Sequence, residues 1–279
     1  MDFEMTSGNT GQACRPVALV TGASAGIGAT YARALARRGY DLLLVARREE
    51  KLQSLAGEIA AEFGCAAEAI VADLTDSDAC QMVADRILAE PRFEFLVNNA
   101  GFGLRPLFHE SDLTSQAAMA RLHVLAVMHL THAAVAGMAR RGKGFVVNVS
   151  SVAAFLHSPS NVMYCSTKAW LNTFSLGLDA ELGGTGVFVQ ALCPGFTYSE
   201  FHDVMQVDRQ AIPAKWWLSA EFVVEKSLAA LDKHPRRVIC IPSLRYKLIT
   251  ALLRILPRPI LNILGKARHK RITKAGLNS

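Results

Sequence analysis

The chain has 279 residues, and 51% of them are apolar, which is enough to bury the core of one large domain. No apolar run reaches the roughly 20 residues of a membrane-spanning helix, and the polar residues 1–15 lack a signal-peptide stretch, so we expect a flexible tail there. The six cysteines are scattered without a Cys-x-x-Cys or His-x-x-x-His pair, which favours reduced thiols, a cytoplasmic compartment and no metal site.

The net charge of +6 is unevenly distributed along the chain. After Asp232 there are twelve lysines or arginines and no acidic residue, whereas the first 232 residues carry 18 basic and 24 acidic side chains. The basic character therefore belongs to the C-terminal segment, and we expect no nucleic-acid partner.

The first predicted strand, Pro16–Val20, is followed at once by a glycine-rich turn and by a helix over 29–38. Such a corner binds phosphate, because glycines let the backbone approach a pyrophosphate whose charge the helix N-terminus stabilises. A plain tight turn is the alternative. The predicted cofactor-binding residues here are Gly22, Ser24, Gly26, Ile27 and Gly28.

The second predicted strand, Asp41–Ala46, ends in Arg47-Arg48 without an acidic residue. In dinucleotide folds an acid at this point holds the ribose 2′-hydroxyl, and an arginine accommodates a 2′-phosphate. The fork of Arg47 suits a phosphate, so the sequence favours NADP(H) over NAD(H). Alternatively, both arginines are solvated at the start of the predicted helix Glu49–Phe63.

The next two strands end in candidate cofactor contacts. Asp73 follows the predicted strand Ala67–Ala72, where it either accepts a hydrogen bond from the adenine amino group or simply ends the strand. Thr75 or Asp76 caps the helix predicted over 77–89. After the strand Phe93–Val97 come two amides, which can bind neighbouring strand ends, and two small residues, which leave room for a cofactor; these are Asn98, Asn99, Ala100 and Gly101.

A long helix is predicted within Thr114–Arg141, before the strand Phe145–Val149 and a helix over 162–182. Tyr164 and Lys168 are four residues apart, so they share a helix face. A fixed cation lowers the pKa of a nearby tyrosine, which can then exchange a proton with an alcohol or a carbonyl oxygen. Ser151 follows the strand, and its hydroxyl can bind the same substrate oxygen. The alternative is a Tyr and a Lys that merely share a helix face.

The strand Val187–Leu192 precedes an irregular segment over 196–218, which is rich in large apolar side chains. Ligands of open α/β sheets bind near this point, so the segment predicts an apolar lid and an apolar substrate. Alternatively, these side chains pack only on their own scaffold. They are Phe196, Phe201, Met205, Ile212, Trp216 and Trp217.

A helix over 220–232, capped by Ser219, and the strand Arg237–Ile241 complete an alternation of strands and helices. This alternation predicts one α/β domain over 16–242, with a Rossmann-type, doubly wound parallel sheet.

Residues 243–279 form a basic C-terminal extension in which Leu244–Leu256 has helical amphipathicity. Its leucines and isoleucines cover one side, and Lys247, Thr250 and Arg254 lie opposite. Thirteen residues are too few to span a bilayer, but they suit a helix in its surface. Alternatively, the helix covers the enzyme's own pocket or a subunit interface.

These motifs, in this order and spacing, resemble the short-chain dehydrogenase/reductase superfamily, classical type, over about Val17 to Ile241. The motifs are Thr21-Gly22…Gly26-x-Gly28, Asp73, Asn98-Asn99-Ala100-Gly101, Ser151, Tyr164-x-x-x-Lys168 and Pro194-Gly195. The stretch Val45–Glu49 and the tail look like bacterial reductases of lipid-like or long-chain ketones.

The resemblance implies a Rossmann fold, an NAD(P)(H) cofactor held partly by Pro194 and Gly195, and hydride transfer to or from carbon. It implies Tyr164 as acid/base and Ser151 as the residue that orients the substrate oxygen. Lys168 would lower the pKa of Tyr164 and hold the nicotinamide ribose, and Thr197 would bind the carboxamide. A fourth member, usually Asn, is replaced by His123 in this chain. We expect His123 either to help hold a water that links Lys168 to solvent, with a pH dependence near neutrality, or simply to pack inside the helix.

The sequence thus predicts an NADP(H)-dependent carbonyl reductase of an apolar ketone, as a cytoplasmic homo-oligomer with peripheral membrane contact through its tail. One alternative is a cofactor-binding redox sensor with little turnover, which the His123 departure favours and the intact Ser151, Tyr164 and Lys168 oppose. The other is an NAD-dependent alcohol dehydrogenase, which Arg47 disfavours.

Overall fold

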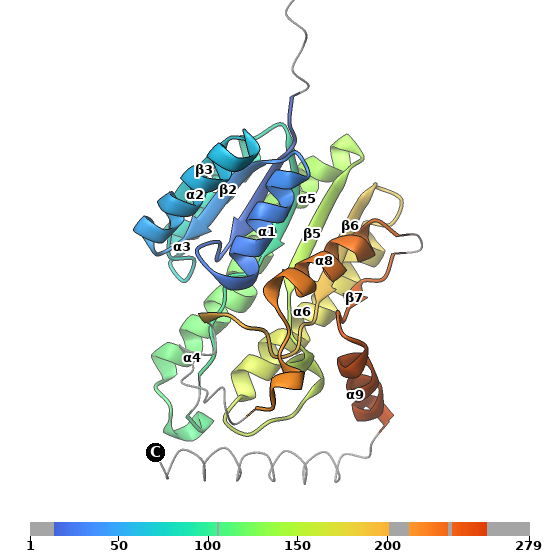
Figure 1. The fold of residues 1–279 in the computed structure, drawn as a ribbon. Helices are drawn as coiled ribbons and strands as arrows, with labels where there is room; N and C mark the ends of the chain where they lie inside the picture. Colours follow the sequence, from blue (N-terminus) through green and yellow to red (C-terminus); the bar gives the residue numbers. More distant parts are fainter. Residues whose placement is uncertain (1–13, 105, 201–211, 234–235, 256–279) are drawn as a thin grey trace, which may run out of the picture.

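A computed structural model describes residues 14–104, 106–200, 212–233 and 236–255 (Figure 1). Within these ranges seven parallel strands form one sheet in the order β3-β2-β1-β4-β5-β6-β7. The predicted doubly wound parallel sheet is therefore confirmed. The strands are β1 Val17–Thr21, β2 Asp41–Ala46, β3 Ala67–Val71, β4 Phe93–Asn98, β5 Gly144–Val149, β6 Val187–Leu192 and β7 Ile239–Cys240.

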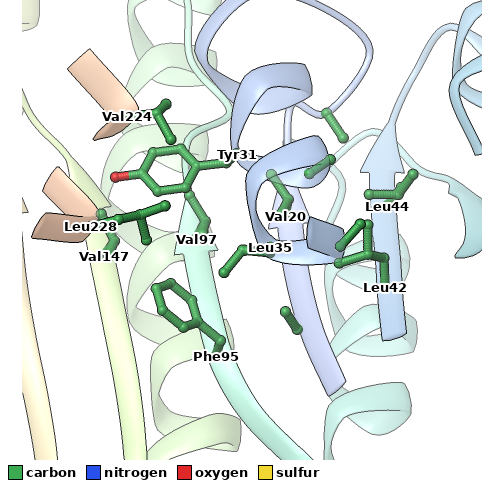
Figure 2. Close-up of a cluster of buried hydrophobic side chains, with 14 of the residues drawn as sticks. Val20, Tyr31, Leu35, Leu42, Leu44, Phe95, Val97, Val147, Val224 and Leu228 are labelled. Carbon is green, nitrogen blue, oxygen red and sulfur yellow. The ribbon is translucent and has the colours of Figure 1, made fainter. Parts of the chain in front are cut away.

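Helices cover both faces of the sheet, so the central strands are buried along most of their length. Every residue of β1 and β6 is buried. Helices α1, α2 and α8 pack on one face, where Tyr31 and Leu35 of α1 lie against strand side chains such as Phe95 (Figure 2). Helices α3 and α5 pack on the other face. The α-helices are α1 Gly26–Arg37, α2 Glu49–Phe63, α3 Ser77–Leu88, α4 Leu113–Ala120, α5 Val127–Arg141, α6 Val162–Glu181, α8 Ala220–Leu231 and α9 Leu244–Ile255.

The structure moves some predicted element ends and decides between the two predicted caps of α3. Helix α1 begins at Gly26, three residues before the predicted start, so Gly26 and Gly28 belong to its first turn. Asp76 is the cap of α3, because its carboxylate accepts hydrogen bonds from the backbone N–H groups of residues 78 and 79. The last strand is shorter than predicted, since only Ile239 and Cys240 pair with β6.

The long helix predicted within Thr114–Arg141 spans Leu113–Arg141 and includes a π-helical segment, η2, over Arg121–Ala126. By length and composition it is apolar enough to cross a membrane, which our expectation from apolar runs missed. Its apolar side chains instead serve the core, because Leu130, Ala134 and Met138 are buried against the sheet and α3.

Helix α9 packs on the body of the protein through Tyr246. Its buried face is formed by Tyr246 and Thr250, whereas we predicted Thr250 on the polar, outward side. Thr250 can be buried because its hydroxyl donates to the Tyr246 carbonyl oxygen, 2.9 Å away. Leu256 and the residues after it lie outside the described part of the chain.

Candidate active site

The carboxyl ends of β1, β4, β5 and β6 bring the predicted motifs to one edge of the sheet. The glycine turn follows β1, the Asn-Asn-Ala-Gly segment follows β4, Ser151 follows β5, and Pro194-Gly195 follows β6. Parallel strands that run adjacent place their ends side by side, and this is where open α/β sheets bind ligands.

The glycine positions of the turn have no room for a side chain. A Cβ on Gly22 would lie 2.8 Å from Asn99 Nδ2, and one on Gly28 would lie 2.3 Å from the Gly22 carbonyl oxygen. The N-cap of α1 is Ala25, which offers no side-chain hydrogen bond, and the first turn carries no acidic residue. The first N–H groups of α1 are thus available to a phosphate, which fits a dinucleotide cofactor.

The Asn-Asn pair holds the neighbouring strands together. Asn99 Nδ2 donates to the carbonyl oxygens of Thr21 at 2.9 Å and Gly22 at 3.2 Å, as the sequence suggested for amides at a strand end. Asn98 Nδ2 instead donates to side chains, namely Thr131 Oγ1 at 3.0 Å and Asn148 Oδ1 at 2.9 Å. The hydroxyl of Thr21, a motif residue to which the sequence assigned no role, accepts from the backbone N–H groups of residues 99 and 100.

Two arginines lie beside the glycine turn. Arg47 is exposed and forms an ion pair with Asp73 at 3.6 Å. Arg48 donates to Ser24 Oγ in the turn, at 3.0 Å from Nη2, and forms an ion pair with Glu200. Hydrogen bonds from Thr75 and the charge of Arg47 lower the pKa of Asp73 despite partial burial, which keeps this carboxylate an acceptor. Both arginines thus lie at the end of β2, where a 2′-phosphate would bind.

Ser151, Tyr164 and Lys168 lie together. The Tyr164 hydroxyl and Ser151 share a side-chain hydrogen bond. Lys168 Nζ lies 5.7 Å from the centroid of the Tyr164 ring and donates to the Val149 carbonyl oxygen at 2.7 Å. The Ser151 hydroxyl also accepts from the backbone N–H of Ala153. Ser151 is thereby the N-cap of the short 3-10 helix η3, Val152–Phe155.

The pKa of Tyr164 differs from our expectation. We expected Lys168 to lower it, but in the protein by itself burial raises the pKa of Tyr164 to about 12, against the opposing effect of the Ser151 hydrogen bond. Burial also lowers the pKa of Lys168 to about 8. The physical reason is that both groups lose hydration, while the ammonium is hydrogen-bonded to a backbone carbonyl.

His123 connects three elements through its two ring nitrogens. Nε2 accepts from the backbone N–H of Phe102 at 3.1 Å, so Nδ1 carries the proton of the neutral ring. Nδ1 then donates to Thr167 Oγ1 at 3.0 Å, and the Thr167 hydroxyl in turn donates a hydrogen bond to the Tyr164 carbonyl oxygen at 3.0 Å. A Cβ on Gly101 would lie 2.7 Å from Nε2, so the glycine makes this contact possible.

The expected pH sensitivity of His123 is wrong. Burial and the nearby Lys168 charge hold the pKa of His123 well below its usual 6.5, so the ring stays neutral near neutrality. Both nitrogens bind protein groups, which leaves no ring atom for the expected water. His123 therefore acts as a positioning residue that ties the segment after β4 to α6.

A hollow lies beside Tyr164, in a place that our sequence analysis missed. It is lined by the segment after β4, by α4 and by the start of α6, and apolar and polar side chains both contribute. The apolar ones are Leu104, Pro106, Phe108, Met119, Val162 and Met163, and the polar ones are Gln116, Ser160 and Asn161. No sequence motif marks these residues, because they come from three separate segments.

The predicted lid is only partly described, since Phe201 and Met205 lie outside the described ranges. Trp217 is buried and its ring stacks on Tyr198, while Trp216 and Phe196 pack with Tyr246 of α9. These rings do not line the hollow at Tyr164. The described rings therefore pack on one another and on α9. Thr197 is buried beside them, and its hydroxyl donates to the Gly195 carbonyl oxygen at 3.1 Å.

Residues 16–210 match the family model described as short chain dehydrogenase. This chain belongs to the short-chain dehydrogenase family. It is 33% identical over 194 residues to the very-long-chain 3-oxoacyl-CoA reductase of Anas platyrhynchos, a match that covers 67% of this chain and 61% of that protein. The chain spans only about three fifths of the length of the first curated relatives it matches, 61% and 62%.

Two solved structures of this family agree with the fold. A short-chain dehydrogenase from Sphingobium yanoikuyae in complex with NADPH is 33% identical, with a TM-score of 0.78 over 87% of this chain and 97% of that one. The bulky-bulky ketone specific alcohol dehydrogenase from Comamonas testosteroni is 31% identical, with a TM-score of 0.74 over 87% of this chain and 95% of that one. The predicted superfamily membership is therefore confirmed.

Replacing His123 should disturb the cofactor side of the site. His123→Ala leaves the Phe102 N–H and Thr167 without their partner, and two lost hydrogen bonds of about 1 kcal/mol each predict roughly ten- to thirtyfold weaker kcat/KM. His123→Asn should recover part of this loss. The exposed His132→Ala is the control. Because the ring of His123 stays neutral, the pH profiles of kcat/KM for the wild type and His123→Asn should have the same shape near pH 6.5.

Lys168 should also make the free energy of unfolding depend on pH. Between its folded pKa of about 8 and its ordinary 10.5, the unfolded chain binds more protons than the folded protein. The free energy of unfolding of the wild type, relative to Lys168→Met, should therefore rise with pH through this window. Urea unfolding at about pH 7.5 and about pH 10 measures the difference. A difference that is constant or falls with pH would contradict the burial of a titrating ammonium.

Proposed function

We propose that this protein is an NADP(H)-dependent reductase of apolar, ketone-type carbonyl compounds. The single observation that carries the proposal is the constellation of Ser151, Tyr164 and Lys168 at the carboxyl edge of the sheet, between the glycine turn and an apolar hollow. The cofactor would supply the hydride. The chain would bind its phosphates at the start of α1, orient the carbonyl oxygen and deliver a proton.

The protonation state of Tyr164 supports the direction of reduction. With a pKa of about 12 the phenol is protonated near neutral pH, so it can donate a proton to the oxygen of a carbonyl that becomes an alcohol. Alcohol oxidation needs the phenolate as a base, which this environment disfavours. Ser151 shares a hydrogen bond with Tyr164, so both hydroxyls are placed to contact one substrate oxygen. Lys168, whose pKa is about 8, is largely protonated and keeps a positive charge beside the ring.

The end of β2 supports NADP(H). Arg47 and Arg48 both lie beside the cofactor turn, and no acidic residue at the strand end competes for a ribose 2′-hydroxyl. The Sphingobium yanoikuyae structure, which contains NADPH, points the same way. Arg48 is held by a close ion pair with Glu200 and by Ser24, whereas the ion pair of Arg47 with Asp73 is longer, at 3.6 Å, and its side chain is 69% exposed, so we assign the larger share of phosphate binding to Arg47.

Cofactor preference therefore tests Arg47 directly. Arg47→Ala should weaken NADPH binding roughly ten- to hundredfold and leave NADH binding nearly unchanged, since an arginine–phosphate contact contributes about 1.5–3 kcal/mol. Titration of each cofactor by protein fluorescence measures both constants. Arg48→Ala is the comparison, and the exposed Arg140→Ala is the control. Equal losses for the two cofactors would mean that Arg47 is a general surface residue.

The hollow beside Tyr164 supports an apolar substrate. Six of its lining side chains are apolar, and they come from the segment after β4, α4 and α6 rather than from the predicted lid. The Comamonas testosteroni structure is described as specific for bulky ketones, and the Anas platyrhynchos relative as a reductase of very-long-chain acyl compounds. The cytoplasmic location and the homo-oligomeric state that the sequence suggested remain predictions.

A ketone series tests the function as a whole. Catalytic efficiency with NADPH should rise with ketone chain length, at about 0.8 kcal/mol or roughly fourfold for each methylene that becomes buried on binding. Met119→Ser should reduce this dependence, because Met119 lines the hollow. NADPH absorbance gives the rates. If the protein binds NADPH but no ketone is reduced, the redox-sensor alternative replaces the reductase; if only an NAD-dependent alcohol oxidation is seen, the dehydrogenase alternative does.

A further inference from the structure

Helix α9 has two apolar sides with different surroundings. On the inner side Tyr246 is 6% exposed, and its hydroxyl accepts from the Phe196 N–H and donates to the Trp216 carbonyl oxygen. On the outer side Leu244, Leu248 and Leu252 are 70%, 65% and 53% exposed. Their spacing of four places these leucines in one line along the helix. We call this line the leucine stripe; a line of exposed large apolar side chains marks an interaction surface.

Basic residues flank the leucine stripe. At about 100° per residue, exposed Lys247 and Arg245 fall on opposite sides of the line. Arg245 Nη1 donates to the carbonyl oxygen of Lys215, which is itself exposed, at 2.7 Å. In the sequence, the 47 residues after Asp232 carry twelve lysines or arginines and no acid. The partner of this surface must therefore accept both apolar chains and positive charge.

We propose that the outer face of α9 binds the surface of an anionic lipid membrane. The leucine stripe enters the boundary between headgroups and acyl chains, and the basic residues lie near the headgroup charges. With twelve residues α9 lies in this surface rather than across the membrane. A second copy of the chain is a poorer partner, because pairing two leucine stripes would also bring two basic surfaces together.

The same helix connects the membrane surface to the active site. The inner side of α9 packs against η3, which begins directly after Ser151. Figure 1 shows α9 at the same end of the molecule as α4, whose residues line the hollow. Docking through the leucine stripe would hold this end against lipid, where an apolar ketone is dissolved. This last step rests on the proposed function, whereas the docking itself does not.

Flotation on vesicles tests the docking without using turnover. The full-length protein should float with phosphatidylcholine–phosphatidylserine vesicles at low salt, and should float less at high salt or with phosphatidylcholine alone. Replacing Leu244, Leu248 and Leu252 by Gln, which preserves helix propensity, should reduce the bound fraction at least about tenfold. Replacing Lys247 by Glu should weaken binding to the anionic vesicles. The control variant replaces three exposed apolar residues elsewhere, Met82, Leu88 and Leu176, by Gln and should float like the wild type.

Two results would overturn the proposal. One is a full-length protein that stays in the aqueous fraction with anionic vesicles at low salt, or a leucine-stripe variant that floats as well as the wild type. The other is a change of molecular mass in analytical ultracentrifugation when the leucine stripe is replaced, without any flotation of the wild type, which would assign the face to a second copy. Reduction of a short, water-soluble ketone by the leucine-stripe variant should equal that of the wild type. If no variant reduces any ketone but the wild type floats, the docking stands and the reductase assignment fails.

Discussion

The hydrogen bond from the buried Lys168 ammonium to the Val149 carbonyl oxygen fixes the relation on which the site depends. It ties helix α6, which carries Tyr164, to the end of β5, where Ser151 begins its turn. A buried ammonium without a partner is costly, so the helix cannot shift along the strand without losing this contact. The Ser150 hydroxyl strengthens the same junction by donating to the Lys168 carbonyl oxygen at 2.9 Å. The chemistry of Tyr164 therefore rests on a backbone contact made by its neighbour one turn away.

A second chain of contacts links this helix to the cofactor side. It runs from the Tyr164 carbonyl oxygen through Thr167 and His123 to the Phe102 N–H, just after β4. The Asn99 side chain then links the same segment to the turn after β1. The polar groups of α6 and the glycine turn are thus connected through short polar contacts across the ends of β5, β4 and β1. Because the ring of His123 is neutral, this connection does not weaken as pH passes through neutrality.

Much of the fold follows from the sequence, since most strands are apolar runs and Asp76, Asp112 and Ser219 mark the starts of α3, α4 and α8 as side-chain caps. The predicted bounds of β2 and α2 match the structure, because a buried run ends at Arg47 and two acidic residues open the helix. The closeness of Ser151, Tyr164 and Lys168 could also be predicted, because Tyr164 and Lys168 keep a helical spacing and Ser151 follows a strand in the same order of motifs. Their pKa values could not, because burial is a property of the packed protein. The hollow and the role of His123 were missed for a related reason: both depend on side chains that approach from distant segments, such as Met119, Thr167 and Phe102.

The contact between Gly195 and Tyr246 limits how this enzyme can be altered. A Cβ on Gly195 would lie 2.0 Å from the Tyr246 ring, so the loop after β6 and the helix α9 fit only with glycine at this position. Any substitution of Gly195 that reshapes the site would push α9 away from the body and tilt its leucine-bearing side. Conversely, a chain without α9 would leave the Phe196 N–H and the Trp216 carbonyl oxygen without the Tyr246 hydroxyl. Redesign of this region must therefore change the loop and the helix as a pair.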